Sequence, residues 1–241
     1  VRKRSRGRLV FVGVLMACVS RHERPGRGHI QHPREPAKGG LASRIRAQDN
    51  GRVQAQLLDP YPGQLVVACS GGADSLALAH LAIMRASKRG EPMPVLAHIN
   101  HGLRPEAAQE AQAVKRFAKA HGARCLVREV ALCSEGASLE ARARDARYSA
   151  LDACASEVGA AWIVFAHTQS DQAETVLMRI VRGTGLVGLA GMSATRGIYA
   201  RPLLGVTRQD TEAYCERNSL VYSSDPMNRE SRFTRVRIRH Q

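Results

Sequence analysis

The stretch Gln64 to Ser75, QLVVACSGGADS, places the strongest constraint on how this 241-residue chain can fold. Gln64 to Cys69 is a short apolar run rich in β-branched residues, which predicts a buried strand. The loop Ser70–Ser75 follows at once, and the Ala/Leu-rich run from Leu76 to Ser87 predicts a helix. A loop in this position leaves backbone N–H groups at the positive end of a helix dipole. The order therefore predicts a phosphate site.

Most residue types in the loop suit phosphate binding. Gly71 and Gly72 let the backbone approach an anion closely, because no Cβ stands in the way, and Ser70 and Ser75 add hydroxyl donors. Asp74 is the exception, because a carboxylate repels phosphate, and its expected role is to hold a Mg²⁺ that bridges to the phosphates. The common P-loop does not fit, since the sequence has no Gly-Lys pair. The alternative is an ordinary strand-to-helix turn.

Apolar runs alternate with helical patterns after this loop. Strands are predicted at Pro94–Asn100, Arg124–Leu132 and Ala161–His167, and helices at Glu106–His121 and Leu139–Val158. Near-continuous apolar strands suit a parallel sheet that is covered on both faces. Their alternation with helices predicts a doubly wound α/β domain with a mostly parallel sheet.

Polar residues gather where these predicted strands end. Asp74 follows the first strand, Asn100 and His101 follow the second, and His167 follows the fourth. Because ligands of such sheets bind beyond the carboxyl ends of the strands, one shared site is expected there. Asp171 comes next, at the start of a helix predicted to run to Arg182. It is interpreted either as a helix cap or as a group that faces nucleotide or metal.

The net charge of +15 favours a polyanionic partner such as nucleic acid. Residues 1–62 carry more than half of this excess, and Arg21–Gly40 is rich in Arg, Gly and Pro without an apolar period. Residues 1–62 are therefore predicted to be a basic, disordered extension, and residues 63–241 the folded domain. Residues 2–19 have the outline of a signal peptide, with an upstream start codon as the competing interpretation.

The six cysteines form no Cys-x-x-Cys pair, so the sequence gives no support to a zinc ribbon or an iron–sulfur site. Scattered single cysteines suit a reducing cytosol. The apolar run near the amino terminus is too short to span a bilayer.

The loop matches every fixed position of SGGxDS, the nucleotide loop of the PP-loop ATP pyrophosphatase superfamily, and resembles it in context. Further blocks follow in order: HINHGLR (His98–Arg104), LEARARDARY (Leu139–Tyr148), AHTQSDQAETVLMRIVRGTGLVGLAGM (Ala166–Met192), RPLLGVTR (Arg201–Arg208) and DPMNRESRFTRVRIRH (Asp225–His240). Together they resemble the tRNA(Ile)-lysidine synthase family. The resemblance covers about Gly63 to Gln241.

That resemblance implies a cytoplasmic ligase with two chemical steps. ATP adenylates the C2 oxygen of the wobble cytidine in the CAU anticodon of tRNA(Ile), releasing pyrophosphate. The ε-amine of free L-lysine then attacks C2 and displaces AMP, forming lysidine. The implied cofactors are ATP and Mg²⁺, and no membrane is involved. The oligomeric state stays open, a homodimer included.

The resemblance also implies roles for individual residues. The ATP-binding residues are Ser70, Gly71, Gly72, Ala73, Asp74 and Ser75. The catalytic residues are Asp74, His167, Asp171 and Arg182, and the Mg²⁺ ligands are Asp74 and Asp171. The substrate residues are Asn100, His101, Arg104, Glu140 and Arg147. Family members commonly carry an acidic residue where Ser170 stands, which leaves Asp171 as the expected ligand.

Two other functions remain open. A tRNA thiolase of the same superfamily would share the loop, although the unpaired cysteines disfavour the thiolases that use paired catalytic or cluster cysteines. A non-catalytic nucleotide- or RNA-binding protein is the second, and the intact Asp74 and Asp171 argue against it. Many family members continue into carboxyl-terminal tRNA-binding domains, which are expected to be absent from this chain. The basic run Arg229–Arg239 is interpreted as an RNA phosphate contact or a solvated terminus.

Overall fold

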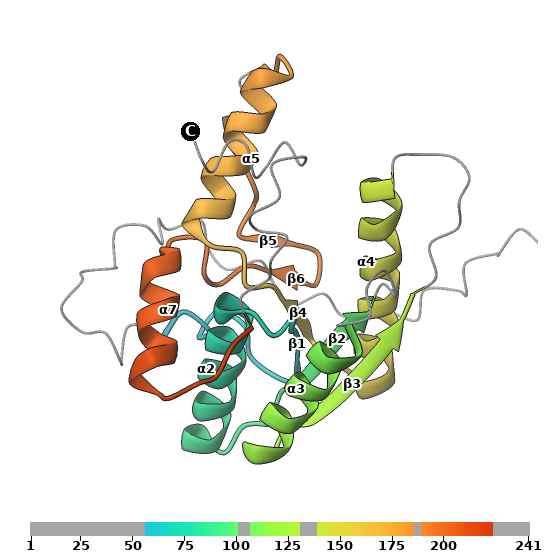
Figure 1. Cartoon of the computed structure of the whole chain (residues 1–241), viewed down its shortest axis with the longest axis vertical. Coiled ribbons are helices and arrows are strands. Elements are labelled where there is room, and N and C mark those ends of the chain that lie inside the picture. Colours follow the sequence, from blue (N-terminus) through green and yellow to red (C-terminus); the bar gives the residue numbers. More distant parts are fainter. Residues whose placement is uncertain (1–55, 101–106, 131–138, 186–188, 224–241) are drawn as a thin grey trace, which may run out of the picture. The chain divides into compact units, whose positions relative to one another are not determined.

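The computed structural model of the chain describes residues 56–100, 107–130, 139–185 and 189–223 (Figure 1). All of these residues belong to one compact unit. The expectations for His101, Arg104, the run Arg229–Arg239 and residues 1–55 lie outside the described residues. So does the side chain of Glu140.

A six-stranded sheet forms the centre of the fold, in the order β3-β2-β1-β4-β6-β5. The strands are β1 (Leu65–Ala68), β2 (Val95–Asn100), β3 (Arg124–Glu129), β4 (Trp162–Val164), β5 (Thr195–Arg196) and β6 (Tyr199–Ala200). β1 pairs in parallel with β2 and β4, β2 with β3, and β4 with β6, while β5 runs antiparallel to β6. The predicted doubly wound, mostly parallel sheet is confirmed, and β1 to β4 fall inside the four predicted strands.

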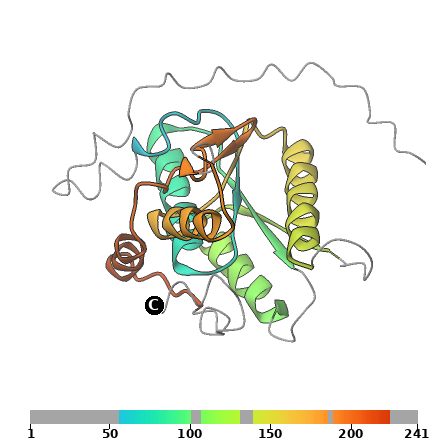
Figure 2. The same ribbon diagram turned by 90° about the horizontal axis from the view of Figure 1, so that it is seen from above.

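The central strands are buried on both faces, which accounts for their continuous apolar sequences. Val66 and Val67 are neighbours in β1 and point to opposite faces, and both are fully buried. Val66 belongs to a core with α4 (Leu139–Val158), and Val67 to a core with α2 (Ala73–Arg89), α3 (Ala107–Ala120) and α7 (Arg208–Arg217). Figure 2 shows α4 on one face of the sheet and the other three helices on the opposite face.

Helix α2 begins directly after the glycine loop. It starts at Ala73, three residues before the predicted start, so Asp74 lies in its first turn. The helix ends at Arg89 and is capped by Gly90, which has a φ of 63° and donates its N–H to the carbonyl of Ala86. A capping residue with this left-handed backbone conformation is usually glycine, because glycine has no Cβ to clash. The early start matters because it places the carboxylate of Asp74 at the positive end of the helix dipole.

Helix α5 (Gln169–Val181) follows β4 and extends away from the carboxyl ends of the strands (Figure 1). The chain then returns through β5 and β6 to α7, three elements that were not predicted from the sequence. Helix α7 starts with a capping box, in which the Thr207 side chain accepts the N–H of Asp210 and the Asp210 carboxylate accepts the N–H of Thr207, each at 3.1 Å. This box fixes where α7 begins.

The packed domain includes residues whose composition had placed them in the extension. Leu57, Leu58 and Tyr61 are buried in the core beside α2, and the Tyr61 ring packs edge-on against Trp162 with centroids 5.3 Å apart. The buried guanidinium of Arg85 donates to the carbonyls of Leu58 and Tyr61. These three residues therefore pack with the domain, although they precede the boundary expected between residues 62 and 63.

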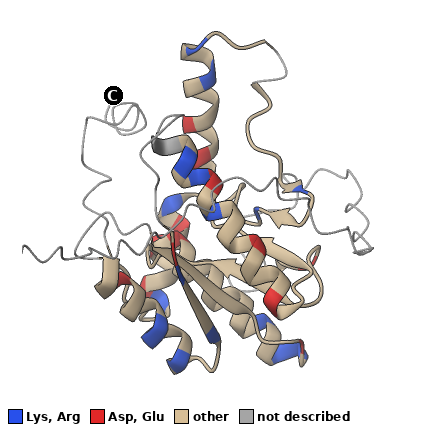
Figure 3. Ribbon diagram, turned by 90° about the vertical axis from the view of Figure 1, so that its right-hand side faces the viewer, with Lys and Arg blue, Asp and Glu red and all other residues tan. Residues whose placement is uncertain are grey.

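Charges of both signs are interspersed along the described helices (Figure 3). Among the residues that the structure describes, no helix is long and apolar enough to cross a membrane.

The burial of the segment before β1 can be tested by removing one side chain. Leu58→Ala is expected to lower the free energy of unfolding by about 2–5 kcal/mol, because a fully buried leucine leaves a cavity. Gln56→Ala, at an exposed position two residues earlier, is the control and should change it by less than about 0.5 kcal/mol. Denaturant unfolding measures both, and equal stabilities for the two variants would place this segment outside the folded unit.

Candidate active site

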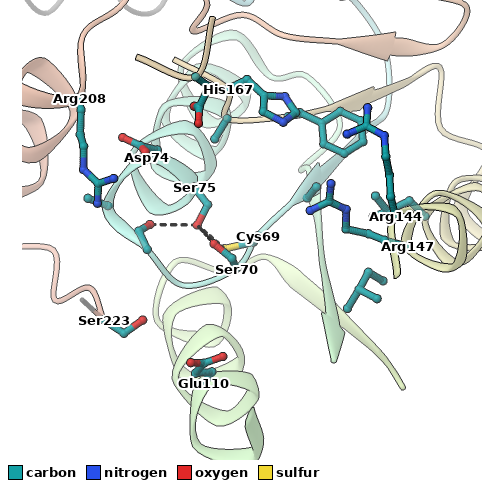
Figure 4. Close-up of a pocket in the computed structure, with 18 residues that line it drawn as sticks. Cys69, Ser70, Asp74, Ser75, Glu110, Arg144, Arg147, His167, Arg208 and Ser223 are labelled. Carbon is teal, nitrogen blue, oxygen red and sulfur yellow. Dashed lines mark hydrogen bonds between the residues drawn. The ribbon is translucent and has the colours of Figure 1, made fainter. Parts of the chain in front are cut away.

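The loop after β1 is closed by the buried hydroxyl of Ser75. This hydroxyl accepts the N–H of Gly71 at 3.1 Å and donates to the carbonyl of Gly72 at 2.9 Å. Its only proton is then in use, so in the 3.2 Å contact between the two serine hydroxyls Ser70 is the donor. One side chain thus joins both ends of the loop (Figure 4).

The same loop leaves backbone donors facing outward. Gly72 is the N-cap of α2 and has no side chain to satisfy the first-turn N–H groups, which remain for a ligand. Gly71 has a φ of 94°, a conformation that strongly favours glycine. Its carbonyl accepts hydrogen bonds from the backbone N–H and the hydroxyl of Ser223, so it is not left bare toward an anion. The geometry is that of an anion cradle.

A cavity of about 520 Å³ opens in front of the loop (Figure 4). Its lining comes from β1, α2, β2, α3, α4, the segment after β4, α5, the start of α7 and Ser223: Ala68, Cys69, Ser70, Gly72, Ala73, Asp74, Ser75, Ile99, Glu110, Arg144, Arg147, Leu151, Phe165, Ala166, His167, Asp171, Arg208 and Ser223. A cavity of this size takes a ligand as large as a nucleotide.

Asp74 stands at the cavity with two groups from α7. The buried hydroxyl of Thr211 donates to its Oδ1, and Arg208 lies nearby. Burial raises the pKa of the Asp74 carboxyl, while the Thr211 hydrogen bond and the Arg208 charge lower it and the charge of Asp171 raises it further. Burial thus costs the carboxylate its hydration, and α7 offsets part of that loss.

Asp171 belongs to the first turn of α5 and acts there as a helix cap. Its Oδ2 accepts the N–H of Thr168 at 2.8 Å and the Thr168 hydroxyl at 3.1 Å. The capping interpretation from the sequence is therefore confirmed. The residue still lines the cavity and interacts electrostatically with Asp74, so its capping role and a ligand-facing role are compatible.

His167 is a neutral group in this site. Burial lowers the pKa of His167 to about 4, the charges of Arg201, Arg147 and Arg144 act in the same direction, and Asp171 opposes them. Its ring stacks on Phe165 with centroids 5.6 Å apart, and its buried Nδ1 makes no hydrogen bond within the described residues. A neutral imidazole with an unused ring nitrogen is suited to hydrogen-bonding a ligand.

Arg144, Arg147 and Phe165 line the side of the cavity that faces α4, and Tyr148 and Arg201 lie against them. The Arg144 guanidinium lies 5.1 Å from the Tyr148 ring centre, and Arg201 lies 5.9 Å from that of Phe165. Arg144 and Arg201 both donate to the Tyr148 hydroxyl, at 3.2 and 3.4 Å. Stacked guanidinium groups beside aromatic rings form a surface suited to bases and phosphates.

The structure gathers many of the predicted residues around one cavity. Ser70, Gly72, Ala73, Asp74, Ser75, Arg147, His167 and Asp171 all line it. Gly71 shapes the loop from behind, and Asn100 ends β2 without lining the cavity.

Arg182 lies away from this cavity. It caps the carboxyl end of α5, is exposed, and is separated from Asp171 by most of a 13-residue helix, about 16 Å of rise. Arg182, a catalytic residue on the resemblance, does not line the cavity in this structure.

Three groups at the site were not predicted from the sequence: Thr211, Arg208 and Ser223. Arg208 closes the block RPLLGVTR, but nothing in that block tells which residue it will face. Thr211 and Ser223 carry no pattern of their own, because their roles arise from the packing of α7 against α2.

The described residues contain no group of three or more His, Cys, Asp and Glu side chains that could hold a metal ion. The four described cysteines, Cys69, Cys125, Cys154 and Cys215, are free thiols. A Mg²⁺ ion requires fewer protein ligands than such a group of three, because one or two carboxylates usually suffice when substrate phosphates and water supply the rest. Asp74 and Asp171 fit that requirement.

A strand, a glycine loop that presents bare N–H groups and an adjacent carboxylate define a nucleotide-binding site of the PP-loop class. The sequence profile of the PP-loop domain matches residues 46–241, and the chain belongs to this family.

The curated relatives in this family include tRNA(Ile)-lysidine synthases. The chain is 44% identical over 185 residues to that of Salinispora tropica, covering 75% of this chain and 55% of the relative. It is 42% identical over 181 residues to that of Rhodopseudomonas palustris, covering 73% and 52%. The chain thus spans about half the length of the curated relatives it matches.

Solved structures share the fold at low sequence identity. A U34-tRNA thiolase from Methanococcus maripaludis, solved with its 4Fe-4S cluster, has a TM-score of 0.64 at 16% identity, covering 78% of this chain and 68% of the thiolase. An NMN synthetase from Francisella tularensis has a TM-score of 0.51 at 12% identity, covering 73% and 72%. Both support the PP-loop fold.

The protonation of His167 gives a direct test of this site. Its ring proton resonance is expected to titrate with a midpoint near 4, whereas an ordinary histidine titrates near about 6.5. NMR titration measures this, and the spectrum of His167→Gln identifies the resonance. Arg147→Gln should raise the midpoint, because it removes a positive charge that opposes protonation. A midpoint at or above that of ordinary histidines would contradict the burial described here.

The same shift has a consequence for stability. Because the pKa of His167 is lower in the folded protein than in the unfolded chain, the unfolded chain binds the proton first as pH falls from about 6.5 to about 4. This histidine therefore lowers stability progressively across that window. The difference in unfolding free energy between the parent and His167→Gln should change with pH within the window and stay constant above it.

Proposed function

We propose that this chain is the ATP-using catalytic domain of a tRNA(Ile)-lysidine synthase. It would join free L-lysine to C2 of the wobble cytidine in the CAU anticodon of tRNA(Ile), by way of an adenylated cytidine. The single observation that carries the proposal is the identity of 44% and 42% to two curated synthases, over 185 and 181 residues of the chain. Both substrates belong to the cytosol, which is the compartment that we propose.

The loop residues account for the first step. The N–H groups of the α2 first turn would bind the phosphates of ATP, because they form a preorganised set of donors. Their orientation is fixed before the nucleotide arrives, since Ser75 closes the loop. The Ser70 hydroxyl donates to Ser75 in this structure and would have to turn its proton toward a phosphate when ATP binds. Arg208, close to Asp74, would add positive charge on the side where pyrophosphate leaves.

Asp74 and Asp171 are the residues that would hold Mg²⁺ in this site. When bound, the ion neutralises phosphate charge and favours departure of pyrophosphate. Arg182 is left out of the proposed site, because it lies at the far end of α5.

The second step would use the other side of the cavity. Arg144 and Arg147 face the cavity from α4 and would hold the cytidine or its phosphate (Figure 4). The amine of lysine must be neutral to attack C2, so a proton acceptor is required. The neutral His167 is a candidate on geometry, although its lowered pKa makes it a weak base. Asn100, His101 and Arg104 remain candidates for the substrate, and Glu140 for the lysine ammonium.

The proposed reaction predicts transfer of lysine to one nucleotide. With ATP, Mg²⁺ and radiolabelled lysine, the chain should label a tRNA(Ile) transcript with a CAU anticodon, and nuclease digestion should locate the label at the wobble cytidine. The same transcript with uridine at that position is the control and should stay unlabelled. Incorporation of sulfur instead of lysine would identify a thiolase, and binding without any transfer would identify a non-catalytic RNA-binding protein.

The role of Asp74 predicts a large loss on neutralisation. Asp74→Asn keeps the size of the side chain but removes its charge, so pyrophosphate release with tRNA(Ile) should fall by at least about 100-fold. Asp59→Asn is the matched control, because Asp59 only forms a half-exposed ion pair with Arg89 on the surface. Near-parental pyrophosphate release by Asp74→Asn would reject this role for Asp74.

A further inference from the structure

Helix α7 and the segment after it contact the nucleotide loop and the first turn of α2. Cys215 lies 3.4 Å from the carbonyl of Ala73, and the N–H of Ser223 donates to the carbonyl of Gly71 at 3.1 Å. Thr211 donates to the carboxylate of Asp74. Three residues far along the chain from the loop thus hold Gly71, Ala73 and Asp74 in place. We call Thr211 and Cys215 of α7, together with Ser223 after it, the α7 buttress.

Thr211 is the member of the buttress that touches a charged group. It is only 2% exposed, and its hydroxyl lies within hydrogen-bond reach of Asp74 Oδ1 and of the Arg208 carbonyl, the latter at 2.7 Å. A hydroxyl has one proton to donate. Hydrogen bonds to a carboxylate are the stronger ones, so the proton goes to Asp74.

The position of Thr211 is itself fixed by its surroundings. The capping box at Thr207 sets the start of α7 one turn earlier. One turn later, the Tyr214 hydroxyl lies 2.7 Å from Nδ1 of His80, a buried residue of α2. Because both neighbouring turns are anchored, the backbone of Thr211 is held in place, which limits how far its hydroxyl can move with Asp74.

We propose that Thr211 is a positioning residue of the nucleotide site. By holding Oδ1 of Asp74, it directs the other carboxylate oxygen, which accepts no hydrogen bond from the described residues, toward the cation that accompanies ATP. This inference rests on the proposed function only for the binding of Mg²⁺ and ATP, and it requires neither lysine nor RNA. The hydroxyl acts through Asp74 and does not touch the substrate.

The test is to remove the hydroxyl and keep the shape. In Thr211→Val, Asp74 loses its fixed orientation, so the Mg²⁺ concentration that half-saturates ATP binding should rise by about tenfold or more, the scale of a lost hydrogen bond to a charged group. Calorimetric titration of the full chain with ATP at a series of Mg²⁺ concentrations measures this midpoint. ATP binding at saturating Mg²⁺ should return to within about threefold of the parent.

Conservative and control variants separate positioning from stability. Thr211→Ser restores a hydroxyl and should bring the Mg²⁺ midpoint back toward that of the parent. Tyr214→Phe removes the hydrogen bond to His80 from the next turn of α7, so it should lower the melting temperature but leave the midpoint unchanged. If Thr211→Val melts too low for study, Thr211→Ala removes the same hydroxyl without placing a branched side chain there.

A parental Mg²⁺ midpoint in Thr211→Val or Thr211→Ala would overturn the proposal and leave Thr211 a structural residue. A midpoint that moves equally in Tyr214→Phe would also overturn it, because the effect would then belong to the packing of α7. A parent that binds Mg²⁺ and ATP but transfers no lysine would contradict the proposed function alone, since this titration needs neither second substrate.

Discussion

The hydroxyl of Ser75 is the interaction on which the nucleotide site depends. It satisfies the N–H of Gly71 and the carbonyl of Gly72 at once, so the loop closes on itself without using the donors that point outward. A longer side chain would fill the cavity, and a residue without a hydroxyl would leave two buried backbone groups unsatisfied. Its burial beneath the loop, at the start of α2, gives the loop a rigid base before any ligand is present.

The two sides of the cavity carry opposite charges, a buried carboxylate near α7 and arginines near α4. Near α7, a carboxylate is partly stripped of water and is compensated by a hydroxyl and an arginine. Near α4, arginines stack on aromatic rings, which accept positive charge on their faces. His167 lies between these regions and is kept neutral by burial and by the arginines. A substrate that carries phosphates at one end and a base at the other matches this division.

Sequence patterns predicted the parts of the fold that repeat a physical rule. The central strands β1 and β4 are continuous apolar runs, and β2 begins as one. The loop between β1 and α2 combines glycines, hydroxyls and a carboxylate in an order that suits a phosphate and its cation. β5 and β6 are two residues each, too short for any periodicity to show. The contact between Thr211 and Asp74 could not be predicted from the sequence, because it arises only when α7 packs against α2. The predicted helix runs to Arg182, the residue that caps α5, and its length places Arg182 away from the strand ends, which a role at the site did not take into account.

The buttress also sets an order of assembly during synthesis. Asp74 and Thr211 are 137 residues apart, so at ribosomal rates of about 5–20 residues per second the loop exists for roughly 7 to 27 s before its support is made. β1 must likewise wait for β4, its partner on the other side. Until then one edge of a strongly apolar strand has no neighbour, which is the condition in which nascent chains aggregate or need a chaperone.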